Sequence, residues 1–180
     1  MSKIKNLIYL IVSLGIITAS MYFVIQKVAP QFISNNTVKP SNQNFPTAPD
    51  FILKDTNNKI VKLADLRGKA VILYFWTSWN NVSAETLKTV SDYSSYLSAD
   101  AALLTINNLE NKSVAEKIGK DQGINAPILI DDEGLVGELY NITTLPLLVF
   151  INKNGQETGR FIGPATAQDI EKGLAAAKTP

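Results

Sequence analysis

The 180-residue sequence contains no cysteine and no histidine. Without cysteine there can be no structural disulfide, no thiolate-bound zinc or iron–sulfur cluster, no lipid-modified cysteine anchor and no thiol mechanism. Without histidine the chain lacks the commonest general base and the commonest transition-metal ligand, and a Ser-His-Asp triad is impossible. Carboxylates, lysines, tyrosines and hydroxyls remain, and we predict neither a cofactor nor a metal site.

Charged residues are few and unevenly distributed. All 16 acidic residues lie from Asp50 onward, whereas four of the 17 basic residues precede it, so the part from Asp50 carries a net charge of −3. Domains that bind nucleic acid usually present a basic surface, so we predict no nucleic-acid partner. The acidic run 131–133 lacks the spaced ligands and closing glutamate of a calcium loop, and we interpret it as a solvated turn.

The N-terminal part carries a long uncharged segment. Residues 6–26, between Lys5 and Lys27, contain no charge and are mostly apolar. As a helix they would reach about 30 Å, the thickness of the hydrocarbon core of a bilayer. We therefore predict a single-pass membrane anchor over residues 1–28. A cleaved signal peptide and a buried core helix are the alternatives, and small residues at 18–20 would suit cleavage.

The basic residues flanking this segment predict its orientation. The amino terminus, Lys3 and Lys5 slightly outweigh Lys27 and Lys39, which favours a cytoplasmic N-terminus. The rest of the chain would then lie on the extracytoplasmic side of a cell membrane, and we expect a bacterial one.

Residues 29–48 change in composition. They are rich in Asn, Ser, Thr and Gln, are punctuated by proline and show no hydrophobic period, which predicts a flexible linker. One PxxP match at 46–49 could also be read as a proline ligand for a partner domain. A folded domain should then occupy residues 49–180.

Residues 49–180 alternate between strand and helix patterns. The run 70–76 is continuously apolar, as in a strand buried on both faces, and Asn154-Gly155 is a strong hairpin turn. This alternation predicts an α/β domain with a mixed central sheet and helices on both faces. The predicted strands are 51–53, 59–63, 70–76, 101–106, 127–130, 147–151 and 157–162, and the predicted helices are 82–97, 113–122, 135–140 and 166–177, with one helical turn at 64–67.

Several short motifs in a fixed order resemble a known family. They look like those of membrane-anchored thioredoxin-like thiol–disulfide oxidoreductases of the cytochrome c maturation type, and are similar to the copper-sensitivity suppressor proteins. The resemblance covers about residues 48–178 and implies a thioredoxin-like fold. The motifs are Ala48-Pro49-Asp50-Phe51, Leu63-Ala64-Asp65-Leu66-Arg67-Gly68-Lys69, Leu73-Tyr74-Phe75-Trp76-Thr77-Ser78-Trp79, Thr144-Leu145-Pro146, Asn152-Lys153-Asn154-Gly155 and Gly163-Pro164.

The redox motif of that family is degenerate in this chain. In the family, Trp is followed by Cys-x-x-Cys at a helix N-terminus, where backbone N–H groups and the helix dipole stabilise the first thiolate. The matching residues here are Trp79-Asn80-Asn81-Val82-Ser83, so Asn80 and Ser83 stand at the two cysteine positions. The resemblance therefore implies the fold and the site but not the reaction. Ser83 or Asn81 is the expected N-cap of the helix.

The resemblance also implies a substrate groove. Pro146 matches the family's cis-proline, and the backbone before it, at Leu145, would bind an extended segment. Tyr74 occupies a position where thioredoxins often carry a buried acid. We assign Leu145, Pro146, Trp76 and Tyr74 to this groove, with Trp76 ending a core strand and Trp79 bordering the exposed site as a possible peptide anchor.

Two functions from different classes follow. The first is a redox-inactive module that binds a protein or an extended peptide without a covalent step. The second is an oxidoreductase by lineage, whose chemistry is lost or depends on a partner's thiols, and a structural membrane subunit is a weaker third. Ser83 as a hydrolytic nucleophile would need a base, and none stands at a recognisable spacing.

Overall fold

The computed structural model describes residues 45–179. The predicted anchor (1–28) and most of the predicted linker (29–48) lie outside this range. No helix within residues 45–179 combines the length and apolar character needed to cross a bilayer.

The folded domain begins slightly earlier than predicted. Ala48 donates its backbone N–H to Gly155 O (2.9 Å), Glu157 donates to Pro46 O (2.9 Å), and Thr47 forms a bridge with Gln156. Because this pairing fixes the backbone against the turn at residues 152–156, residues 46–48 belong to the domain and not to the linker.

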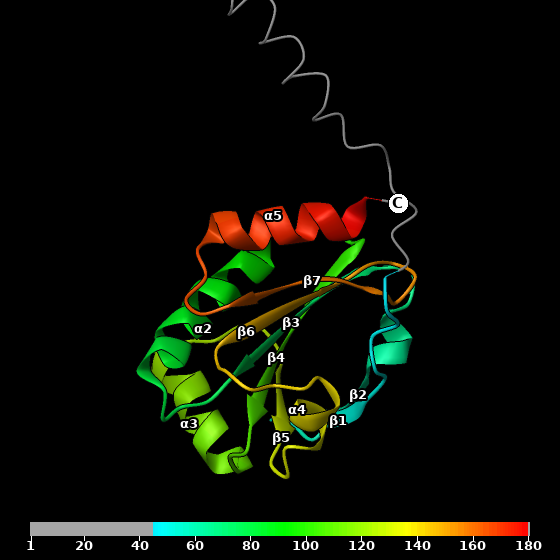
Figure 1. The fold of residues 1–180 in the computed structure, drawn as a ribbon. Coiled ribbons are helices and arrows are strands. Elements are labelled where there is room, and N and C mark those ends of the chain that lie inside the picture. Colours follow the sequence, from blue (N-terminus) through cyan, green and yellow to red (C-terminus); the bar gives the residue numbers. More distant parts are fainter. Residues whose placement is uncertain (1–44, 180) are drawn as a thin grey trace, which may run out of the picture. The chain divides into compact units, whose positions relative to one another are not determined.

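A single mixed sheet organises the described residues (Figure 1). Its strand order is β2-β1-β5-β4-β3-β6-β7, with β3, β4 and β5 parallel and the remaining neighbours antiparallel. The strands are β1 (Ile52–Asp55), β2 (Ile60–Lys62), β3 (Ala70–Trp76), β4 (Ala101–Asn108), β5 (Ile128–Asp131), β6 (Leu147–Ile151) and β7 (Glu157–Ile162). This is the mixed sheet that the alternating pattern predicts.

Helices cover both faces of the sheet, as expected (Figure 1). Leucine, valine, isoleucine and alanine side chains of α2, α3 and α5 pack on one face, and those of η1 and α4 pack on the other. The helices are α2 (Asn81–Tyr93), α3 (Lys112–Gln122), α4 (Leu135–Leu139) and α5 (Ala167–Lys178), with 3-10 turns η1 (Leu63–Leu66) and η2 (Ser94–Tyr96).

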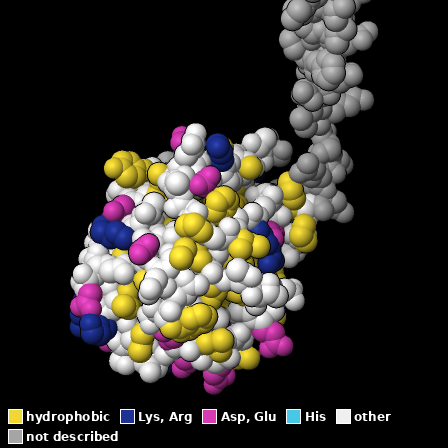
Figure 2. All heavy atoms as spheres, turned by 60° about the vertical axis from the view of Figure 1, so that its left-hand side comes forward, with side chains coloured by type: hydrophobic (Ala, Val, Ile, Leu, Met, Phe, Trp, Pro, Cys, Tyr) yellow, Lys and Arg dark blue, Asp and Glu magenta, His cyan; other side chains and the backbone are white. Residues whose placement is uncertain are grey.

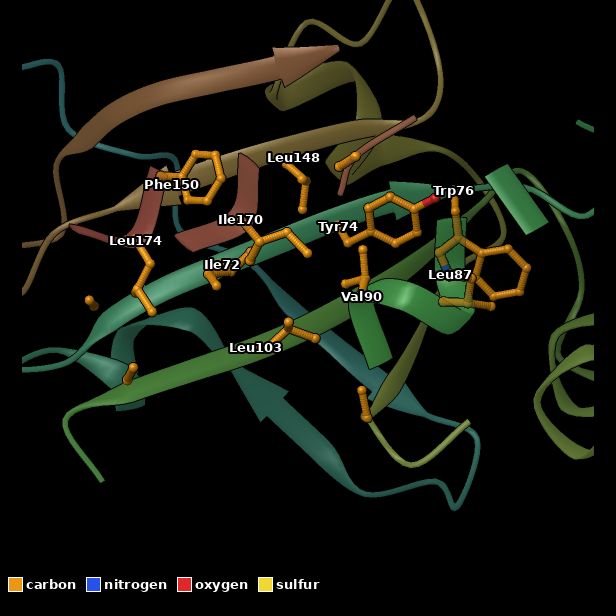
Figure 3. Close-up of a cluster of buried hydrophobic side chains, with 14 of the residues drawn as sticks. Ile72, Tyr74, Trp76, Leu87, Val90, Leu103, Leu148, Phe150, Ile170 and Leu174 are labelled. Atoms are coloured by element: carbon orange, nitrogen blue, oxygen red, sulfur yellow. The ribbon is translucent and has the colours of Figure 1, made fainter. Parts of the chain in front are cut away.

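The central strand β3 supplies both layers of the core. Ile72, Tyr74 and Trp76 point to the α2 and α5 side, where Figure 3 shows them among Leu87 and other buried residues. The intervening side chains, such as Phe75, point to the α4 side. All seven residues of β3 are buried, which explains why its sequence is apolar without alternation.

Helix α2 is shorter than predicted. It ends at Tyr93, and the chain continues as the 3-10 turn η2 instead of reaching residue 97. The Ser94 hydroxyl donates to Ser91 O (2.6 Å) and the Ser95 hydroxyl donates to Asp92 O. Serine side chains that bond to nearby carbonyls compete with helical hydrogen bonding, so the α-helix ends there.

The topology brings five strand ends to one edge of the sheet. Because β3, β4 and β5 are parallel, their carboxyl ends meet there. β6 is antiparallel to β3 and starts at the same edge, and β7 ends there. In open α/β sheets, ligands bind outside the carboxyl ends of the strands, so this edge is the place to look for a site.

Candidate functional site

The start of α2 is built around Asn80. This residue has an extended backbone (φ −98°, ψ 106°), and its side-chain oxygen accepts a hydrogen bond from Ser83 N (3.1 Å). Asn80 is therefore the N-cap, which corrects the expectation of Ser83 or Asn81. The N-cap oxygen satisfies one of the N–H groups that a helix start leaves free.

The other end of the Asn80 amide reaches a distant loop. Asn80 Nδ2 donates to the backbone oxygen of Leu145 (3.1 Å), 65 positions along the chain. The Leu145–Pro146 peptide bond is cis, as the family resemblance implies. One uncharged side chain thus joins the helix start to the cis-proline loop, at the position where the resemblance implies a reactive sulfur.

Ser83, at the second cysteine position, is enclosed. Its side chain is fully buried, and its hydroxyl oxygen has no hydrogen-bond partner within residues 45–179. Its backbone oxygen accepts a hydrogen bond from the Tyr74 hydroxyl (2.8 Å). Solvent and substrates cannot reach this serine, so it is unsuited to nucleophilic catalysis.

Tyr74 and Trp76 lie beneath the site and do not line a groove. Both side chains are fully buried in the layer between β3 and α2 (Figure 3). Burial raises the pKa of the Tyr74 phenol, and a hydrogen bond with Thr86 lowers it by less. The assignment of these two side chains to a substrate groove is therefore wrong, because packed layers cover both faces of β3. Their role is to support the start of α2.

Of the remaining assigned residues, Pro146 is buried and the others reach the surface at least in part. Trp79 is 70% exposed, Val82 and Asn81 are also exposed, and Leu145 is half-buried against the α4-side core. Trp79 therefore lies where the sequence places it, beside the helix start.

Apolar side chains are concentrated at this edge of the sheet. Of the nine large hydrophobic side chains exposed within residues 45–179, six lie at or next to the ends of β3, β4, β5 and β7 that meet here. Figure 2, which turns the side with α2 and α3 forward, shows hydrophobic side chains spread over the middle of that face. The six are Trp79, Val82, Leu109, Leu135, Leu139 and Ile162.

Glu110 completes the loop that holds Trp79, and sequence reasoning missed it. One Glu110 oxygen accepts from Ser78 N (2.7 Å) and from the Asn107 side-chain amide (2.7 Å). The other accepts from the Ser78 hydroxyl. No motif marks this glutamate, because its partner at Ser78 is 32 positions away and meets it only through the pairing of β3 with β4.

Comparison with known proteins identifies the family of this chain. The family model described as AhpC/TSA family matches residues 46–156. The chain belongs to the AhpC/TSA family. Its similarity to thiol-disulfide oxidoreductase ResA of Geobacillus kaustophilus is 35% identity over 133 residues, which cover 73% of this chain and 76% of that protein.

Solved structures of similar proteins share the fold. StoA from Bacillus subtilis matches with a TM-score of 0.63 and 26% identity, over 70% of this chain and 96% of that one. The pneumococcal exposed lipoprotein thioredoxin Etrx1 from Streptococcus pneumoniae matches with a TM-score of 0.62 and 27% identity, over 71% of this chain and 98% of that one. The predicted thioredoxin-like fold and the predicted kinship with thiol–disulfide oxidoreductases are confirmed.

The names of the relatives describe thiol–disulfide oxidoreductases. This AhpC/TSA-family chain lacks the chemical group that such a reaction needs. Thiol–disulfide exchange requires a thiolate that attacks a disulfide sulfur, and these 180 residues contain no cysteine. The family's fold is present, and a capping, bridging amide stands at the position where the resemblance implies the attacking sulfur.

Proposed function

We propose that this chain is a redox-inactive, membrane-tethered module that binds a protein or an extended peptide segment without a covalent step. The observation that carries the proposal is the state of Asn80. Both polar ends of its side chain are used within the fold, to Ser83 N and to Leu145 O. The residue that would react in a thiol enzyme is thus a structural element here, while apolar side chains around it stay exposed.

The backbone before Pro146 offers a place for an extended segment. The hydrogen bonds of the described residues include none from the Leu145 N–H, whereas the neighbouring Pro146 oxygen accepts from Gly163 N (2.9 Å). A free N–H beside exposed apolar side chains suits β-type pairing with an added strand. The Leu145 oxygen accepts from Asn80, which leaves it a second lone pair.

Trp79 is the best anchor on this surface. It is 70% exposed, and the Ser78–Glu110 hydrogen bonds fix the loop just before it. A large exposed aromatic ring on a fixed loop gains much apolar contact for little lost conformational freedom. Trp79 should therefore contribute more to binding than any other single side chain at the site.

The proposal also includes the cellular location of the module. The uncharged segment 6–26 would hold the domain at a bacterial membrane, on its extracytoplasmic side. The name of one similar protein, the pneumococcal exposed lipoprotein, describes an exposed and lipid-attached protein. A tether raises the effective concentration of a weak binder near its partners.

Tryptophan substitution tests the binding proposal. The probe is a fluorescein-labelled peptide of alternating leucine and serine, titrated with the full-length protein and followed by anisotropy. Trp79→Ser should weaken binding by about tenfold, as for a central aromatic anchor. Tyr96→Ser is the matched control, because Tyr96 is equally exposed but lies beyond the far end of α2.

Two results would refute the proposal. One is unchanged binding in the Trp79 variant. The other is thiol–disulfide reductase activity in the unmodified chain, which would favour an oxidoreductase that uses a partner's thiols.

A further inference from the structure

Leu109 adopts a backbone conformation that leucine rarely takes. Its φ is +59°, in the left-handed region, and its side chain is 62% exposed. A side chain with a Cβ is disfavoured there, whereas glycine and asparagine are tolerated. Little of the leucine is buried to offset this cost, so its presence is unexplained by the stability of the domain alone. Strained residues of this kind cluster at functional sites.

Leu109 is the centre of a group of exposed leucines. Its side chain lies over Gly134, where an added Cβ would come within 2.5 Å of Leu109 Cδ2. Gly134 is the N-cap of α4, and α4 exposes Leu135 and, one turn later, Leu139. We call Leu109, Leu135 and Leu139 the leucine patch.

Acidic side chains border the leucine patch. Asp132 and Glu133 precede Gly134, and Glu138 lies on α4. None of these three carboxylates forms an ion pair with another residue of the range 45–179. In Figure 2, acidic side chains gather along the lower edge of the domain, beside hydrophobic ones.

Two cations near the patch are already engaged. Lys112, which starts α3, pairs with Glu116 (3.3 Å), and Arg160 pairs with Glu157. Asp132, Glu133 and Glu138 therefore leave negative charge without an ion-pair partner at the border of the leucine patch. Such a surface repels an anionic lipid bilayer and attracts a cationic partner.

We propose that the leucine patch docks a cationic, apolar segment of a protein partner. The proposal rests on the proposed function, because the patch extends the binding surface from the end of β3 across the ends of β4 and β5. Leucines of the patch would bury the apolar side chains of the segment, and Asp132, Glu133 and Glu138 would pair with its lysines or arginines. Leu109 is the specificity-determining residue. Its left-handed backbone places its side chain between the exposed leucines of α4 and the acidic side chains of the border.

Substitution of Leu109 separates binding from stability. Leu109→Gly and Leu109→Asn both fit a left-handed backbone, so the melting temperature should be unchanged or higher. Binding of a fluorescein-labelled peptide of alternating leucine and lysine to the full-length protein should nevertheless weaken by about tenfold. The control is Ile60→Ser, which removes a similarly exposed apolar side chain from β2.

Peptide charge tests the acidic border. The unmodified protein should bind the leucine–lysine peptide more tightly than a leucine–glutamate or a serine–lysine peptide, and added salt should reduce the difference between the first two. The double variant Glu133→Lys/Glu138→Lys should reverse the preference between lysine and glutamate. Equal binding of all three peptides would overturn the proposal.

The Trp79→Ser variant distinguishes failure of this proposal from failure of the proposed function. If Trp79→Ser weakens binding of the leucine–lysine peptide and the Leu109 variants do not, the leucine patch is not a docking site and the binding module stands. If neither substitution has an effect, both proposals fail. If only the Leu109 variants weaken binding, the leucine patch is a binding surface and the role given to Trp79 is wrong.

Discussion

At the edge of the sheet where β3, β4 and β5 end, six large apolar side chains are exposed and Leu109 has a left-handed backbone. At the opposite edge, surface ion pairs join distant parts of the chain, Arg67 with Asp50 and Lys178 with Asp100. Asn154-Gly155 closes the tight β6–β7 turn there, with Gly155 at φ 79°. The second edge has the features of an optimised surface, and the first keeps features that stability alone would remove.

The comparison of the two edges shows which features of the domain its stability does not explain. At the first edge, a buried serine has no hydrogen-bond partner within residues 45–179, which costs free energy, and exposed leucines form a patch. Natural proteins accept such costs at sites of binding or catalysis. Because catalysis by sulfur is excluded by composition, the departures favour binding.

The largest effect should come from restoring sulfur at the first edge. Asn80→Cys/Ser83→Cys places two thiols at the start of α2, where the helix N-terminus should lower the pKa of the first below about 8.5. We expect reductase activity in this variant and none in the unmodified chain, with a loss of stability of about 1 kcal/mol because the N-cap bond of Asn80 is removed. Insulin reduction and thiol titration measure both.

The double variant also checks the alignment with the family. A pair that cannot form an intramolecular disulfide would mean that Asn80 and Ser83 do not occupy the two cysteine positions. The variant Ser94→Cys/Ser95→Cys, with two thiols at the other end of α2, is a control that should show no such activity.

A stability effect of about 3 kcal/mol is expected for Asp131→Ala. Asp131 is buried at the first edge and accepts from Val136 N (3.1 Å) and Gly137 N (2.8 Å), and so holds the start of α4. Its removal leaves two buried N–H groups without an acceptor. Asp100→Ala, at the exposed ion pair of the opposite edge, should leave the denaturation midpoint unchanged. If the two substitutions lowered the free energy of unfolding equally, the proposed difference between the two edges would be refuted.

The smallest predicted effect is on stability. Two serine-to-alanine substitutions near the two ends of α2 should change the free energy of unfolding in opposite directions. The Ser83 hydroxyl is buried without a partner within the described residues, so Ser83→Ala should stabilise the domain by about 1 kcal/mol. The buried Ser91 hydroxyl accepts from Asn125 N (2.9 Å) and Ala126 N (3.2 Å), so Ser91→Ala should destabilise it by about 1–2 kcal/mol. Urea denaturation of both variants decides this, and destabilisation by Ser83→Ala would contradict the account of the site.

Most of the fold could be predicted from local sequence patterns. The apolar run 70–76, the Asn154-Gly155 turn and the helix periods define elements that the structure reproduces within a few residues. Those features depend on residues close together in the chain. The boundaries of α2 were wrong because serine side chains near residue 94 compete with the helix, which a hydrophobic period does not register.

The sequence by itself determined that this protein has no sulfur nucleophile, and its resemblance to the family implied that the site lies after Trp79 and that the Leu145–Pro146 bond is cis. Only the tertiary structure decided what each site residue does. It joined Asn80 to Leu145 and Ser78 to Glu110. These contacts join residues tens of positions apart, and local patterns carry no information about such contacts. The proposed binding surface could therefore be described only once the strand ends had been brought together.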